Sequence, residues 1–168
     1  MDACGTGANA AEAAIEYLIT KWLHVLSSTI LFGTGIGTAF YIFFGTRLSD
    51  ATVAAAFMRW AVIADWLFTA STMILQPLTG YYLIRLLGLP WSTPWIAWSV
   101  GLYVLAGLCW LPVVWLQIRM RDLALQAAGE GKPLPPLFWK LRQVWVGLGV
   151  PALFAFLAVF YLMIAKPS

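Results

Sequence analysis

Residues 61–84 read AVIADWLFTASTMILQPLTGYYLI, and they decide the fold of the chain. The run is apolar enough to cross a bilayer as a helix, which needs about 20 residues. Polar residues recur in it at spacings of three and four, so they share one face of a helix. Lipid cannot solvate them, and we therefore expect this stripe to face the interior of a helix bundle. The stripe consists of Asp65, Thr69, Thr72, Gln76 and Thr79.

The composition indicates that the whole chain, and not only this segment, is built for a membrane. Of its 168 residues, 62% are hydrophobic and only 10% are charged, whereas a soluble domain carries roughly 25% charged residues. Backbone polar groups in lipid must bond within the protein, and runs this long do so as helices. The sequence predicts an all-α integral membrane protein, a single transmembrane domain over residues 1–168. We expect a four-helix up-down-up-down bundle with helices at about 17–44, 58–87, 95–118 and 144–164.

The charged residues predict an orientation. Basic residues collect on the cytoplasmic side of membrane proteins, and most of them here follow the first and third helices. Both termini are therefore expected on the periplasmic side of a bacterial inner membrane, consistent with the acidic residues Asp2, Glu12 and Glu16. We interpret the cations as anchors to anionic lipid head groups, not as a nucleic-acid site. Those on the cytoplasmic side are Arg47, Arg59, Arg119, Arg121, Lys132, Lys140 and Arg142; the others are Lys21, Arg85 and Lys166.

Common motifs narrow the function further. Cys4 and Cys109 form no CxxC pair, so neither a zinc knuckle nor a redox dithiol is indicated. The glycine-rich run GTGIGT, residues 33–38, lacks the strand and turn of a dinucleotide site. Its Gly33 and Gly37 form a GxxxG pair, which favours close helix contact and a homodimer.

One half of the bundle is a candidate haem site. The only histidine, His24, shares a helix face with Gly35. Gln76 and Arg85 are expected at a similar depth, and an amide, a guanidinium and an imidazole together could hold a planar ligand that carries carboxylates. His24 would supply an axial nitrogen to haem iron. The second ligand position would be open, or would be taken by Met163 or by His24 of a second protomer. The alternative is a buried histidine that is merely hydrogen-bonded, to Ser28 or Gln76.

The other half carries a second polar cluster. Asp65 lies a turn or two inside the membrane, where an unpaired carboxylate is expensive. Arg142 and Arg119 are its candidate partners, and Gln117 lies on a neighbouring helix at a similar depth. We expect an ion pair that ties three helices together. The alternative interpretation is a proton or ligand site.

Several segments resemble a family of bacterial predicted integral membrane proteins of unknown function. The resemblance covers nearly the whole chain. It is carried by KWLHVLSSTILFGTGIGTAFY at 21–41, DWLFTASTMILQPLTGYYL at 65–83, CWLPVVWLQIRMRDL at 109–123 and GVPALFAFLAVFYLMIAKP at 149–167.

A more distant resemblance points to haem. The layout is similar to the four-helix bacterial protoporphyrinogen IX oxidases and to copper-resistance D-type membrane domains. The similar segments are WLH at 22–24, FMRW at 57–60, LTG at 78–80, Val150-Pro151 and Lys166-Pro167. In the oxidase family the histidine of the first helix is implicated in binding haem b, which implies that role for His24. That family also uses a lysine in its third helix, where this chain has none and Ser99 is the nearest position.

These observations leave three functional hypotheses. The first is a membrane protein that binds haem b and passes electrons to quinone or to a partner in the membrane, which would make it a haem-dependent oxidoreductase. The second is a subunit or assembly factor without a cofactor. The third is a small proton-coupled transporter that uses Asp65.

Overall fold

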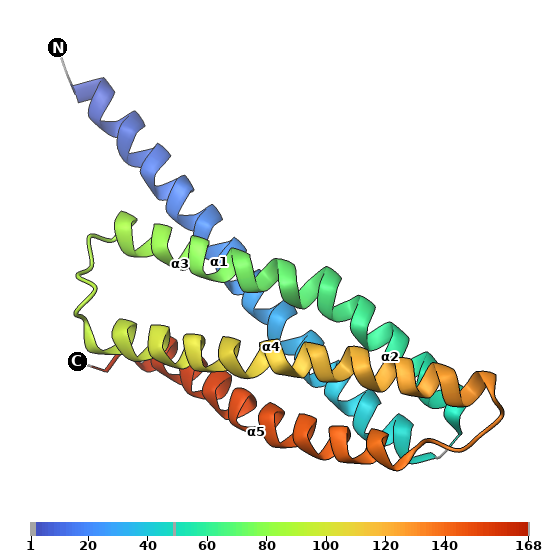
Figure 1. The fold of residues 1–168 in the computed structure, drawn as a ribbon. Coiled ribbons are helices and arrows are strands. Elements are labelled where there is room, and N and C mark those ends of the chain that lie inside the picture. The colour runs from blue at the N-terminus through green and yellow to red at the C-terminus, as the bar shows by residue number, and fades with distance from the viewer. Residues whose placement is uncertain (1–2, 49, 168) are drawn as a thin grey trace.

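The computed structural model is almost entirely helical (Figure 1). It describes the backbone of residues 3–48 and 50–167 and the side chains of residues 11–47 and 50–167, so the side chains of Asp2 and Cys4 lie outside the described residues. Four helical runs within the described part are long and apolar enough to cross a membrane. The elements are α1 (Ala3–Gly45), η1 (Thr46–Leu48), α2 (Ala51–Ala64), the π-helical η2 (Asp65–Thr69), α3 (Ala70–Leu86), α4 (Pro94–Gly129) and α5 (Pro136–Ala165).

The predicted all-α bundle is confirmed, and the helices run alternately up and down (Figure 1). They are longer than expected, since α2 starts at Ala51 and α4 continues to Gly129. Hydropathy reports the part of a helix that lies in lipid, whereas local capping sets its ends. Asp50 caps α2 by accepting a hydrogen bond from the Thr52 amide at 2.7 Å. Gly88 and Gly131, both at positive φ, follow the ends of α3 and α4.

The helices pack as an open series and not as a closed ring. Helix α1 packs on α2 and α3, α2 packs on α4, and α4 packs along α5. The described residues of α1 and α5 meet at few points, so the two outer helices of the series leave a seam between them.

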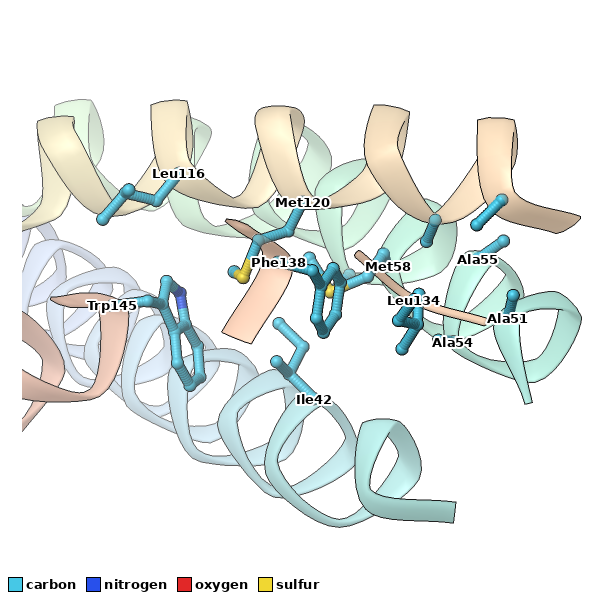
Figure 2. Close-up of a cluster of buried hydrophobic side chains, with 13 residues drawn as sticks. Ile42, Ala51, Ala54, Ala55, Met58, Leu116, Met120, Leu134, Phe138 and Trp145 are labelled. Carbon is cyan, nitrogen blue, oxygen red and sulfur yellow. The ribbon is translucent and has the colours of Figure 1, made fainter. Parts of the chain in front are cut away.

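A cluster of buried apolar side chains packs one half of the bundle, and Figure 2 shows it in close-up. Met58 of α2, Met120 of α4 and Phe138 of α5 are fully buried there. Alanines on α2 and α4 allow these two helices to approach closely, as small residues do in membrane bundles. We call this half the basic end, because the α1–α2 and α4–α5 connections and the cations predicted to be cytoplasmic belong to it. The remaining members of the core are Ile42, Ala51, Ala54, Ala55, Ala61, Leu116, Ala124, Ala127, Leu134 and Trp145.

A proline in α3 explains one hydrogen bond between helices. Pro77 has no backbone N–H, so the carbonyl of Met73, four residues earlier, loses its helical donor. The hydroxyl of Tyr103 on α4 donates to that carbonyl at 2.6 Å. The bond satisfies a group that lipid could not solvate, and it joins two helices that otherwise make little contact.

A double-mutant cycle tests this compensation. Tyr103→Phe leaves the Met73 carbonyl without a donor and is expected to lower the free energy of unfolding by about 1–2 kcal/mol. In a Pro77→Ala background the restored backbone N–H of residue 77 can bond the Met73 carbonyl. Tyr103→Phe should then lower the free energy of unfolding by clearly less. Thermal unfolding in lipid nanodiscs measures both. Equal losses in the two backgrounds would contradict the compensation.

Candidate functional site

His24 is held by α3. Its Nδ1 lies 2.8 Å from the Thr79 hydroxyl oxygen, and that hydroxyl donates to the Leu75 carbonyl at 2.8 Å. A hydroxyl has a single proton, so Thr79 accepts here and the Nδ1–H of His24 donates. The lone pair of the neutral ring is therefore on Nε2. The expected partners were Ser28 and Gln76, but the side-chain partner is Thr79.

The contact between α1 and α3 is close at this point. Gln76 Nε2 donates to the backbone carbonyl of His24 at 3.0 Å. A Cβ added to Gly80 would lie 3.3 Å from Cε1 of the imidazole, so glycine gives the ring its place. His24 and Gln76 are thus neighbours, as expected. The Gln76 side chain bonds the backbone carbonyl of His24, however, and not its imidazole.

The other residues predicted for a haem site are distributed over the bundle. Arg85 is exposed in the last turn of α3. Met163 is half-buried on α5, which packs along α4. Gly35 borders a different feature, a cavity in the middle of the bundle.

This central cavity has a volume of about 420 Å³ and is bordered by all four membrane runs. Its walls include Asp65 and Thr69 on η2, two residues of the predicted polar stripe. The walls hold no lysine, arginine or histidine, and they are mainly apolar. The lining residues are Leu31, Phe32, Gly35, Ile36, Thr38, Ala39, Phe40, Phe43, Asp65, Thr69, Met73, Ala106, Trp110, Val113, Gln117, Trp145, Val146, Gly149, Val150, Ala152, Leu153 and Phe156.

The predicted ion pair of Asp65 is wrong. Asp65 is 3% exposed, and its Oδ1 accepts a hydrogen bond from the Thr69 hydroxyl at 3.0 Å. The side chain of Gln117 also interacts with this carboxyl. Among the residues that the structure describes, Asp65 has no cationic partner within salt-bridge distance.

The two arginines expected to pair with it lie elsewhere. Arg142 Nη2 donates to the Phe43 carbonyl at 2.8 Å, and the guanidinium lies 4.6 Å from the centre of the Phe43 ring. Arg119 is exposed. Long cationic side chains near helix ends extend toward the membrane surface, which carries both guanidinium groups away from the aspartate.

Three buried polar atoms of residues that line the cavity lack a hydrogen-bond partner. They are the indole Nε1 of Trp110, the indole Nε1 of Trp145 and the amide Oε1 of Gln117. Gln117 is 2% exposed and Trp145 is 6% exposed. Such groups are normally satisfied, and in lipid an unsatisfied one costs several kcal/mol.

The geometry can now be compared with known proteins. The family model described as Predicted integral membrane protein (DUF2269) matches residues 18–167. The chain belongs to this family. No curated protein and no solved structure matches it. The matched range in this DUF2269 member includes His24 and the whole central cavity, so both features lie within the family's domain. It is an integral membrane protein with four candidate spans in its described part.

Sequence reasoning missed two parts of the cavity of this DUF2269 protein. The π-helical turn η2 places Asp65 and Thr69, and such turns concentrate at functional sites, but the sequence carries no signal for it. The unpartnered indoles of Trp110 and Trp145 received no role in the sequence analysis. Tryptophan inside an apolar run is itself a signal, because its N–H requires an acceptor.

Replacing the aspartate tests the absence of an ion pair. Asp65→Asn keeps an oxygen that can accept from Thr69, so the free energy of unfolding should change by less than about 1 kcal/mol. Breaking a buried ion pair would cost about 3–5 kcal/mol. Thermal unfolding in nanodiscs distinguishes the two, with Thr69→Val as the comparison that removes the donor. A loss of about 3–5 kcal/mol would instead indicate that Asp65 has a cationic partner.

Proposed function

We propose that this protein binds a small lipid-soluble molecule inside the bilayer, in its central cavity. The observation that carries the proposal is that three residues lining the cavity, Trp110, Gln117 and Trp145, each have a buried polar atom without a partner. A ligand that pairs with them removes their desolvation penalty, whereas the empty cavity keeps it. Ligand pockets have volumes of about 300–1,000 Å³ and mostly apolar walls with a few placed polar groups, and this cavity fits that description.

The other two hypotheses, a subunit without a cofactor and a proton-coupled transporter, account less well for the cavity. A subunit that served only as a helical scaffold would gain stability by filling its centre. A proton-coupled transporter would need Asp65 to exchange protons with both sides of the membrane. Ligand binding accounts for the cavity and for its unpartnered groups together.

Two glycines on α5 provide a matched test. A side chain at Gly149 would enter the cavity and one at Gly147 would point elsewhere, and in both cases a new Cβ meets no atom within 4 Å. Both changes to leucine improve helix propensity by a similar amount, of about 1 kcal/mol. Gly149→Leu should reduce the hydrophobic compound that co-purifies with the protein at least about tenfold, consistent with a blocked site. Gly147→Leu should retain it.

Mass spectrometry of organic extracts, normalised to protein, measures this. Bulk phospholipid in the same extract serves as the internal reference. Identical extracts from both variants, or an extract without any compound enriched over bulk lipid, would refute cavity binding.

A second candidate function, haem b binding at His24, rests on a separate observation. The bond to Thr79 sets the tautomer and leaves the Nε2 lone pair available. Iron-ligating histidines are commonly oriented in this way by a hydrogen bond from their other nitrogen. His24 thus fits one axial position, and bound haem would supply one-electron chemistry. Among the described residues, no group of three or more His, Cys, Asp or Glu side chains is placed to hold a metal ion. The resemblance to haem-binding oxidases agrees with this role.

An absorption spectrum tests haem binding. After reconstitution with haem the protein should show a Soret band, and His24→Ala should abolish it. Thr79→Val removes the acceptor of Nδ1–H, makes the imidazole a weaker donor to iron, and should raise the midpoint potential. Thr29→Val is the control, since the Thr29 hydroxyl bonds only within α1. A reconstituted protein that stays colourless, or a spectrum unchanged in His24→Ala, rules out this site.

A further inference from the structure

The seam between α1 and α5 opens the central cavity toward the lipid. Two contacts bridge the seam. Phe32 and Phe160 meet edge to face with ring centres 5.2 Å apart, and Arg142 bonds the Phe43 carbonyl nearer the basic end. The cavity lies between these two levels, because it is lined from Leu31 to Phe43 on α1 and from Trp145 to Phe156 on α5.

The residues along the two sides of this opening are small or exposed. Phe40 is 56% exposed and Val150 is 47% exposed, although both border the cavity. Gly35 and Gly149 line the cavity from α1 and α5, and a Cβ at either position would meet no atom within 4 Å. We call this opening the lateral mouth. A ligand that enters through it comes from the hydrocarbon of the bilayer, not from water.

The polar groups of the residues that line the cavity define the chemistry of the ligand. The indole N–H groups of Trp110 and Trp145 need acceptors, and Gln117 Oε1 needs a donor. The Asp65 carboxyl adds a further polar group at the same wall, with no cation among the lining residues. A fatty acid or a phospholipid head group would place an anion beside this carboxyl. A plain hydrocarbon would leave all three unpartnered atoms unsatisfied.

We propose that the cavity holds the head group of a lipid-soluble quinone, with the isoprenoid tail leaving through the lateral mouth. A quinone is neutral and flat, and its two carbonyl oxygens are acceptors for the two indole N–H groups. In the reduced form its hydroxyls are donors, for which Gln117 Oε1 and the Asp65 carboxyl are acceptors. The inference rests on the proposed binding function, and it names the class of ligand for that site.

The test uses a benzoquinone with a ten-carbon tail as the probe, titrated into the full-length protein in nanodiscs. The wild-type protein should bind it at one site, and decylbenzene, which lacks the oxygens, should bind much more weakly. Trp110→Phe and Trp145→Phe should each raise Kd about tenfold, the effect of one lost hydrogen bond. Trp98→Phe and Trp115→Phe are matched controls, because these indoles are 67% and 57% exposed. Gln117→Leu should weaken binding of the quinol more than that of the quinone.

Four outcomes would overturn the assignment. If the quinone and decylbenzene bind equally, or if the two cavity tryptophan variants bind as the controls do, the head group is not recognised. If tetraphenylphosphonium binds more tightly than the quinone, and Asp65→Asn abolishes this, the cavity is a site for lipophilic cations. In each of these three cases Gly149→Leu should still block binding of the probe. The proposed binding function of the cavity would then stand, and only the assignment to a quinone would be wrong. If no probe binds and Gly149→Leu changes nothing, the proposed function fails as well.

Discussion

Inside a bilayer no water is available, so every polar group of the chain must find its partner within the protein. This constraint explains why polar side chains in the described structure face other helices or bond back to their own. Ser, Thr and Tyr hydroxyls donate to backbone carbonyls throughout the spans, as Thr20 does to Glu16 and Thr38 to Thr34. Where Pro77 removes a backbone donor, Tyr103 supplies another from the neighbouring helix. Against this background, the unpartnered atoms of residues that line one cavity form an exception that a ligand would explain.

The two halves of the bundle differ in how they avoid unsatisfied polar groups. The basic end is packed by alanine, methionine and aromatic side chains, and it needs few polar contacts (Figure 2). The opposite half joins α1 to α3 through hydrogen bonds from His24 and Gln76. The cavity lies where one type of packing gives way to the other, next to the π-helical turn that interrupts the helical repeat. The position of the cavity therefore follows from the way the helices around it pack.

Helical periodicity predicted the fold and the inward faces, because spacing along a helix fixes which residues share a side. It placed Asp65 and Gln117 toward a common interior, where the structure has both at one cavity. Periodicity does not fix which inward residues touch. Arg142 was assigned to Asp65 from depth alone, whereas its long side chain reaches the Phe43 carbonyl. Thr79 was part of the stripe, but its bond to His24 depends on the closeness that Gly80 permits. Tertiary distances of this kind are not encoded in the order of residues along one helix.

The length of α1 has a consequence for the lateral mouth. Its 43 residues extend for about 65 Å, well beyond a hydrocarbon core of about 30 Å, and its N-terminal part runs past the other helices (Figure 1). Such a helix tilts or projects according to the thickness of the membrane around it. Because α1 also forms one side of the mouth, we expect membrane thickness to set the width of the entrance. The lipid composition of the membrane would then regulate how readily the cavity exchanges its contents.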